Sequence, residues 1–169
     1  MEEKIKIRFL KLSDKAELAK LANNKRVWDN LRDYIPFPYE ESDAEFFIDL
    51  TKKENPKQTF GIEYKGKLSG VIGLVIQKDV YKKSAEIGYW IGEPFWGNGI
   101  ATKAVELITK YGFEKLDLNR IYTGVFEYNT ASMKVLEKNG FEKEGTFKNA
   151  IFKNDKICDE HRFYKLNEK

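Results

Sequence analysis

Apolar and polar positions alternate at the start of the chain and then change to a helical period. The stretch IKIRFL, residues Ile5–Leu10, alternates apolar and basic side chains, which predicts a strand with one buried face. The segment that follows brings Leu18, Leu21 and Ala22 onto one side of a helix, and Ser13 stands where an N-cap is expected. The pattern therefore predicts a strand followed by an amphipathic helix.

The helical pattern is then interrupted and resumes. A second short helix is predicted over Lys25–Arg32, and the stretch DYIPFPYE, residues 33–40, is expected to be irregular because it contains two prolines. Ser42 and Glu45 have the spacing of a capping box, so a further helix is expected to open there and to run to about Lys53.

From residue 58 onward the apolar runs become short and rich in Val, Ile and Phe. QTFGIEY and LSGVIGLVIQ flank a KGK turn and predict a hairpin, and SAEIGYWI predicts a further strand. Behind the stretch FWGNGIATKA a helix is expected through about Tyr111. RIYTGVFEY predicts a strand, Asn129 is expected to cap a helix that stops at Gly140, and FEKEGTFKNA and KICDEHRFYKL predict two last strands.

The order of these elements indicates the fold class. One strand is followed by two or three helices, three strands, a helix, a strand, a helix and two strands. Neither strict strand–helix alternation nor hairpins alone explain this order, so we expect an α/β protein with a mixed sheet and helices on both faces. The two strands joined by the helix behind FWGNGIATKA should be parallel, because a crossover connects them.

Composition narrows the possible partners. The 169 residues suit one domain, residues 1–169, and the net charge of +3 is too small to predict nucleic-acid binding. The chain has no apolar run of signal-peptide or membrane-spanning length. Its single cysteine, Cys158, cannot form an intrachain disulfide, and with the single His161 it cannot build a zinc site. We therefore expect a cytoplasmic protein without a membrane, metal or nucleic-acid partner.

The stretch FWGNGIATKA, residues 95–104, is the first candidate binding site. A helix N-terminus exposes unpaired N–H groups, and the glycines Gly97 and Gly99 would let a phosphate approach the backbone closely. A Walker loop is excluded because Ala104 follows Lys103, and a dinucleotide fingerprint fails because Thr102 takes its third small position. A pair of turn glycines without any ligand remains the alternative.

This region resembles the GNAT N-acetyltransferases, in particular their RimJ/RimL-like branch. The resemblance runs from AEIGYWI through FWGNGIATKAVELITKYGF to LNRIYTGVFEYNTASMKVLEKNGFEKEG and covers roughly Ser84–Gly145. The family's pyrophosphate loop, Q/R-x-x-G-x-G/A, falls on Trp96–Ala101, where Trp96 departs from the usual first residue. The resemblance implies a mostly antiparallel twisted sheet of about seven strands with a splayed parallel pair in the middle.

The resemblance also implies acetyl-CoA as co-substrate. The loop would bind its pyrophosphate, and backbone groups of the splayed strand would bind its pantetheine arm. Lys103, Lys134 or Lys138 could meet the 3′-phosphate, although each taken alone suits an ordinary exposed lysine. The residues expected at the cofactor are Tyr89, Ile91, Trp96, Gly97, Asn98, Gly99, Ile100, Ala101, Thr102, Asn129, Ser132 and Lys138.

Three side chains are candidates for catalysis. The string N-x-x-S…K-x-G-F matches the RimJ/RimL pattern, which implies that Asn129 contacts the cofactor or positions the amine and that Ser132 protonates the leaving thiolate. A helix cap and a small back-bonded serine are the alternative roles. Glu86 is the candidate base or, equally, an exposed strand-end glutamate. Tyr128 and His161 are weaker candidates.

The acceptor site is expected in the irregular segment Trp28–Tyr39. Its aromatic residues predicted to bind substrate are Trp28, Tyr34, Phe37 and Tyr39. Five acidic residues could attract a cationic amine or could simply be solvated: Asp29, Asp33, Glu40, Glu41 and Asp43.

The expected function is transfer of an acetyl group to a primary amine by direct attack in a ternary complex, by a monomer or a homodimer. The family's acceptors include protein N-termini, amino acids, polyamines and drugs. A non-catalytic acyl-CoA-binding domain and a nucleotide-binding domain are the two alternatives.

Overall fold

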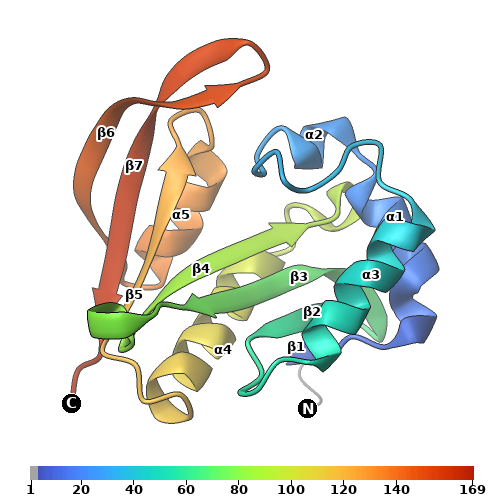
Figure 1. Cartoon of the computed structure of the whole chain (residues 1–169), viewed down its shortest axis with the longest axis horizontal. Coiled ribbons are helices and arrows are strands. Elements are labelled where there is room, and N and C mark those ends of the chain that lie inside the picture. Colours follow the sequence, from blue (N-terminus) through green and yellow to red (C-terminus); the bar gives the residue numbers. More distant parts are fainter. Residues whose placement is uncertain (1–3) are drawn as a thin grey trace.

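A computed structural model describes residues 4–169, so residues 1–3 of the charged N-terminal segment lie outside the description. Seven strands form one twisted sheet in the order β1-β2-β3-β4-β5-β7-β6 (Figure 1). Their bounds are β1 Ile5–Arg8, β2 Thr59–Tyr64, β3 Lys67–Ile76, β4 Ser84–Ile91, β5 Arg120–Phe126, β6 Glu142–Lys153 and β7 Lys156–Leu166. The expected mixed sheet with about seven strands is confirmed.

Only the central pair of strands is parallel. Every other neighbouring pair runs antiparallel, whereas β4 and β5 run in the same direction. The α-helix α4, Ile100–Glu114, connects them, as a parallel crossover requires. The predicted parallel pair is therefore confirmed.

Helices cover both faces of the sheet (Figure 1). The N-terminal helices are α1 Lys15–Ala22, α2 Lys25–Trp28 and α3 Glu41–Lys52, and the C-terminal ones are α4 and α5 Thr130–Lys138. Short 3-10 turns cover Leu12–Asp14, Asp79–Tyr81 and Glu93–Phe95. α1 and α3 pack on one face through a buried cluster that includes Leu18, Ile48 and Val71. α4 and α5 pack on the other face, with Ile108 and Leu136 completely buried.

α4 lies very close to the sheet because of one glycine. A Cβ atom added to Gly112 would come within 2.8 Å of Leu74 Cδ1 and 3.0 Å of Ile121 Cδ1. A larger residue here would have to displace these side chains, so the glycine lets α4 pack closely against β3 and β5.

Two helix starts differ from the sequence predictions. α1 begins after a 3-10 turn with Asp14 at its N-cap, so the expected N-cap Ser13 is wrong. The capping box of α3 joins Glu40 to Asp43, whose Oδ2 accepts a hydrogen bond of 2.8 Å from Glu40 N; the expected box at Ser42 and Glu45 is wrong. In both cases an aspartate accepts a hydrogen bond from the backbone N–H three residues before it, Asp14 from Lys11 and Asp43 from Glu40, so the chain turns earlier than the serines predict. α2 also ends four residues before the predicted Arg32, at Trp28.

Candidate functional site

The FWGNGIATKA stretch forms a glycine turn directly before α4. Gly97 and Gly99 have φ values of 77° and 71°, in the left-handed region that favours glycine. Gly99 is the N-cap, and the N–H groups of the first turn, Ile100–Thr102, have no intrahelical acceptor by the geometry of an α-helix. No atom lies within 4 Å of a Cβ added at either glycine, so the surface in front of the helix is open.

Trp96 and Asn98 hold this turn in place. The Trp96 indole Nε1 donates a 2.7 Å hydrogen bond to the Ile91 carbonyl at the end of β4. The Asn98 side-chain amide donates to the carbonyls of Phe95 and Trp96 at 3.0 and 3.2 Å. The Arg26 guanidinium lies 5.2 Å from the centre of the Trp96 ring. Trp96 therefore anchors the loop to the strand, a role the sequence pattern did not indicate.

β4 and β5 part in front of this turn. Their pairing covers only Ser84–Glu86 of β4 against Arg120–Tyr122 of β5, so the later residues of both strands diverge. The Gly92 N–H, directly after β4, donates to the Ser69 carbonyl of β3. Hydrogen-bonded and non-hydrogen-bonded pairs alternate along an antiparallel ladder, so the backbone groups of Tyr89 and Ile91 point away from β3. They face the gap that opens towards β5, although the Ile91 carbonyl is already bound by Trp96.

Ser132 and Tyr89 meet across this gap. The Ser132 Oγ lies 2.7 Å from the Tyr89 hydroxyl, and either atom can be the donor. Burial raises the pKa of Tyr89 to about 12, so its hydroxyl is protonated at neutral pH. Asn129 caps α5, because its Oδ1 accepts a 3.3 Å hydrogen bond from Ser132 N. The structure thus brings Asn129 and Ser132 together with Tyr89.

Glu86 lies on the opposite face of β4 from Tyr89. Its carboxylate forms an ion pair with Arg32, from the segment after α2, and its side chain is 21% exposed. The partner of Glu86 on β5 is Tyr122, whose pKa is raised first by burial and then by the Glu86 carboxylate. The roles of Glu86 and Ser132 in catalysis remain predictions.

The four aromatic residues expected at the acceptor site do not all lie together. Trp28 and Phe37 stack with ring centres 5.5 Å apart, and Tyr34 is exposed. Tyr39 is buried in the cluster of α1 and α3, which separates it from the other three.

The acidic residues near this segment are already bound within the chain. Asp29 forms an ion pair with Lys25 and accepts a hydrogen bond from Asn154 Nδ2 at 2.9 Å. Burial opposes ionisation of Asp29, but these hydrogen bonds outweigh it and lower the pKa of its carboxyl.

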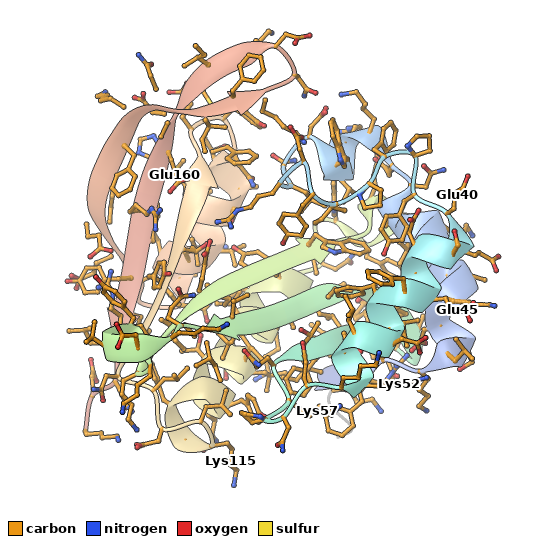
Figure 2. All side chains as sticks on the ribbon, in the orientation of Figure 1. Glu40, Glu45, Lys52, Lys57, Lys115 and Glu160 are labelled. Atoms are coloured by element: carbon orange, nitrogen blue, oxygen red, sulfur yellow. The ribbon has the colours of Figure 1, made fainter. Side chains whose placement is uncertain are left out.

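Of the other acidic residues, Asp33 is also bound within the chain, whereas Glu40 and Glu41 lie at the start of α3. Asp33 pairs with Lys153 at 2.7 Å. Glu40 belongs to the capping box of α3 and lies at the far side of the molecule from Glu160 of β7 (Figure 2). Glu41 is the exposed first residue of α3.

The remaining candidates are spread around this region. Tyr128 donates its hydroxyl to the Asp29 carbonyl, and burial raises its pKa to about 12. Burial also raises the pKa of the Cys158 thiol, which keeps it protonated at neutral pH. His161 Nδ1 lies 3.4 Å from Thr146 Oγ1. Lys134 and Lys138 are exposed on α5, and Lys103 lies 3.0 Å from Glu106.

The tip of the β6–β7 hairpin also belongs to this region, which the sequence pattern did not indicate. A hollow of about 670 Å³ lies between the hairpin tip, α2, Trp96 and the β5–α5 loop. Its lining residues are Arg26, Asp29, Asn30, Trp96, Glu127, Tyr128, Lys153, Asn154, Lys156, Ile157 and Cys158. Asn154 and Asp155 at the turn are a recognisable hairpin signal, but nothing local indicates what the tip contacts.

A buried carboxylate on β7 was also missed. Glu160 is 8% exposed and lies 2.5 Å from Arg162 Nε. Its side chain lies over Gly124 of β5, where an added Cβ would collide with it. Alternation along KICDEHRFYKL would have put Glu160 on one face with Arg162, but it does not predict that Glu160 lies over Gly124 of β5.

The described part of the chain, residues 4–169, shows neither a membrane-spanning helix nor a metal site. None of its helices has both the length and the apolar character needed to cross a membrane. Within the same range, no three or more His, Cys, Asp or Glu side chains are grouped as metal ligands would be.

Comparisons with known sequences identify the family. The model of the acetyltransferase (GNAT) domain matches residues 4–142. The putative ribosomal N-acetyltransferase YdaF of Bacillus subtilis (strain 168) is 32% identical over 161 residues, which cover 91% of this chain and 86% of YdaF. The spermidine N(1)-acetyltransferase of Escherichia coli (strain K12) is 29% identical over 156 residues, covering 89% and 79% of the two chains.

Solved structures share the fold. The microcin C7 self-immunity acetyltransferase MccE, crystallised with acetyl-CoA and AMP, has a TM-score of 0.83 and 29% identity, covering 98% of this chain and 94% of MccE. RimL, the ribosomal L7/L12 α-N-protein acetyltransferase in complex with coenzyme A, has a TM-score of 0.84 at 22% identity, covering 98% and 95%. Since the family model covers most of the chain and YdaF is similar along nearly all of it, this protein belongs to the GNAT N-acetyltransferases.

Proposed function

We propose that this protein transfers the acetyl group of acetyl-CoA to a primary amine by direct attack in a ternary complex, as a single domain over residues 1–169 in the cytoplasm. The observation that carries the proposal is the parting of β4 and β5 in front of the glycine turn of α4. MccE, which has the same fold, is crystallised with acetyl-CoA.

Acetyl-CoA would lie along this opening. Its pyrophosphate suits the exposed N–H groups of the turn and the first residues of α4, where the helix dipole favours an anion. Its pantetheine arm suits the edge of β4 at Tyr89, whose backbone groups face the gap. The Ile91 carbonyl contributes less than expected, because the Trp96 indole already binds it.

Ser132 would supply the proton that the leaving thiolate needs. As the amine nitrogen bonds to the acetyl carbon and the carbon–sulfur bond breaks, Ser132 Oγ gives its proton to the sulfur. The Tyr89 hydroxyl, 2.7 Å away and protonated at neutral pH, can then return a proton to Ser132. Asn129 fixes the start of α5 and so the position of Ser132.

Glu86 would accept the proton that the attacking amine loses. Its pairing with Arg32 holds the carboxylate on the face of β4 that the segment after α2 covers. Glu160, over Gly124 of β5, is a second carboxylate. Both carboxylates pair with an arginine, but the Glu86 side chain is 21% exposed and that of Glu160 only 11%, so Glu86 is easier for an amine to reach and is our first candidate.

The acceptor class is narrowed by charge. YdaF is named for a ribosomal acceptor and the E. coli relative for spermidine. In this chain Asp29 and Asp33 are bound to Lys25, Asn154 and Lys153, which leaves Glu127 as the other carboxylate in the lining of the larger hollow. We therefore favour an acceptor with a single amine, such as a protein N-terminal α-amine or a small monoamine, over a polycation.

The test begins with calorimetric titration of the wild-type protein with acetyl-CoA, with NAD and ATP run alongside. We expect acetyl-CoA alone to bind. Release of free thiol is then followed with N-terminal peptides, monoamines and spermidine as acceptors. Binding without turnover of any amine would favour the alternative, a non-catalytic acyl-CoA-binding domain, whereas no binding of acetyl-CoA to folded protein would refute the proposal.

A further inference from the structure

Lys153 is buried at the end of β6 although it carries a charge. Its side chain is only 3% exposed, and its Nζ lies 2.7 Å from Asp33 Oδ1. The same nitrogen lies 3.1 Å from the centre of the Trp28 ring. A buried ammonium is costly unless ion pairing or a cation–π contact compensates it, and Lys153 has both partners on the segment after α1.

A second contact joins the same two parts of the chain. Asn154, next to Lys153 at the hairpin tip, donates to Asp29 Oδ1 at 2.9 Å. Asn154 and Asp155 both have positive φ, 52° and 60°, which is the geometry of a tight two-residue turn that suits the twist of the strands. The tip is therefore held to the segment 28–33 at two adjacent residues, and we refer to these contacts as the Lys153 bridge.

The Lys153 bridge stands between two hollows. The larger one, about 670 Å³, includes Trp96 and Tyr128, next to the start of α4 and α5. The smaller one, about 190 Å³, includes Arg32 and Phe126, on the side of the Glu86–Arg32 pair. Lys153 is the one residue that lines both hollows.

We propose that Lys153 is a specificity-determining residue that divides the acceptor groove and excludes long or branched acceptors. The inference rests on the proposed function. With the bridge closed, the two hollows stay separate and only an acceptor with a slender group near its amine fits past the Lys153 side chain. Loss of the bridge joins the hollows into one groove beneath the hairpin and admits bulkier acceptors.

The experiment compares Lys153→Ala and Asp33→Ala with wild-type protein. Lys153→Ala removes the side chain that lies between the hollows, Asp33→Ala removes the carboxylate that holds it, and Lys143→Ala, at an exposed position on the same strand, is the matched control. Initial rates are measured with glycinamide, phenylalaninamide, tetra-alanine amide and spermidine. We expect the ratio of kcat/KM for tetra-alanine amide to that for glycinamide to rise about tenfold in both variants, the size of a typical shape discrimination in a pocket.

Three readouts distinguish this role from a merely structural one. The KM for acetyl-CoA should stay within about twofold of wild type, and the double variant should resemble either single one because both break the same bridge. Amide hydrogen exchange should become faster in segments 28–35 and 149–158 together. Turnover with an unchanged acceptor ratio, or the same change in Lys143→Ala, would overturn the inference. Wild-type protein that binds acetyl-CoA but acetylates none of the four amines would count against the proposed function itself.

Discussion

Replacing Gly99 by glutamate tests the proposed phosphate site, and the same replacement at Gly66 is its control. Gly99 has φ of 71° and no atom within 4 Å of an added Cβ, so the new side chain fits without a collision. Gly66, in the turn between β2 and β3, has φ of 79° and equally open surroundings. Gly66→Glu therefore carries the same backbone strain and the same added charge, but outside the glycine turn that precedes α4.

The expected magnitudes follow from this geometry. A non-glycine residue in the left-handed region costs about 1–2 kcal/mol, so both variants should melt about 2–8 °C below wild type. Only Gly99→Glu brings a carboxylate next to the proposed pyrophosphate site. Like charges about 4 Å apart repel by about 1 kcal/mol in water and about 4 kcal/mol near a protein surface, which predicts a Kd for acetyl-CoA about fivefold to a thousandfold higher.

The assay is titration calorimetry of both variants with acetyl-CoA at low and at high salt. Because part of the effect is electrostatic, the loss in Gly99→Glu should shrink as the salt concentration rises. Equal affinities in wild type, Gly99→Glu and Gly66→Glu would show that the turn holds no phosphate. An equal loss in the two variants would attribute it to strain rather than to the site.

Three further predictions concern catalysis and stability. Ser132→Ala should lower kcat about a hundredfold or more while acetyl-CoA binding is retained, because only the proton donor is lost. An unchanged kcat, measured by the release of free thiol, would exclude Ser132 as the proton donor. Glu86→Gln, which can still accept a hydrogen bond from Arg32, should lower kcat by a similar factor, and a normal rate would leave the base to be sought elsewhere. Burial opposes ionisation of Asp14, but hydrogen bonds from Arg8 and Lys11 outweigh it and lower its pKa in the folded protein below the ordinary 3.8. This pair therefore stabilises the fold at pH values above 3.8, and the stability is lost as the pH falls from 3.8 through the folded-state pKa. Thermal unfolding between about pH 6 and 2 should therefore be less pH-dependent in Asp14→Asn, and identical profiles would contradict the assignment.

Local patterns were sufficient for most of the secondary structure. The Val- and Ile-rich runs became β2, β3 and β4, and Asn129 caps α5 as its sequence position predicts. Gly140, with φ of 79°, follows the end of α5. These features depend on neighbours within one helical turn or one strand, which the sequence displays directly. The errors at Ser13 and Ser42 arose because the aspartate beside each serine accepts a hydrogen bond from the backbone N–H three residues earlier.

Local sequence was therefore enough to predict the order of the elements, the glycine turn before α4 and the N-x-x-S start of α5. The contact of Lys153 with Asp33 across 120 positions and that of Arg32 with Glu86 across 54 depend on tertiary packing. No period or local motif encodes such pairs, because each joins a loop to a strand brought near it by the packing of the whole sheet. The cofactor side of the proposed site can thus be predicted from local sequence. The acceptor side depends on the packing of the β6–β7 hairpin against the segment after α2, which local sequence does not show.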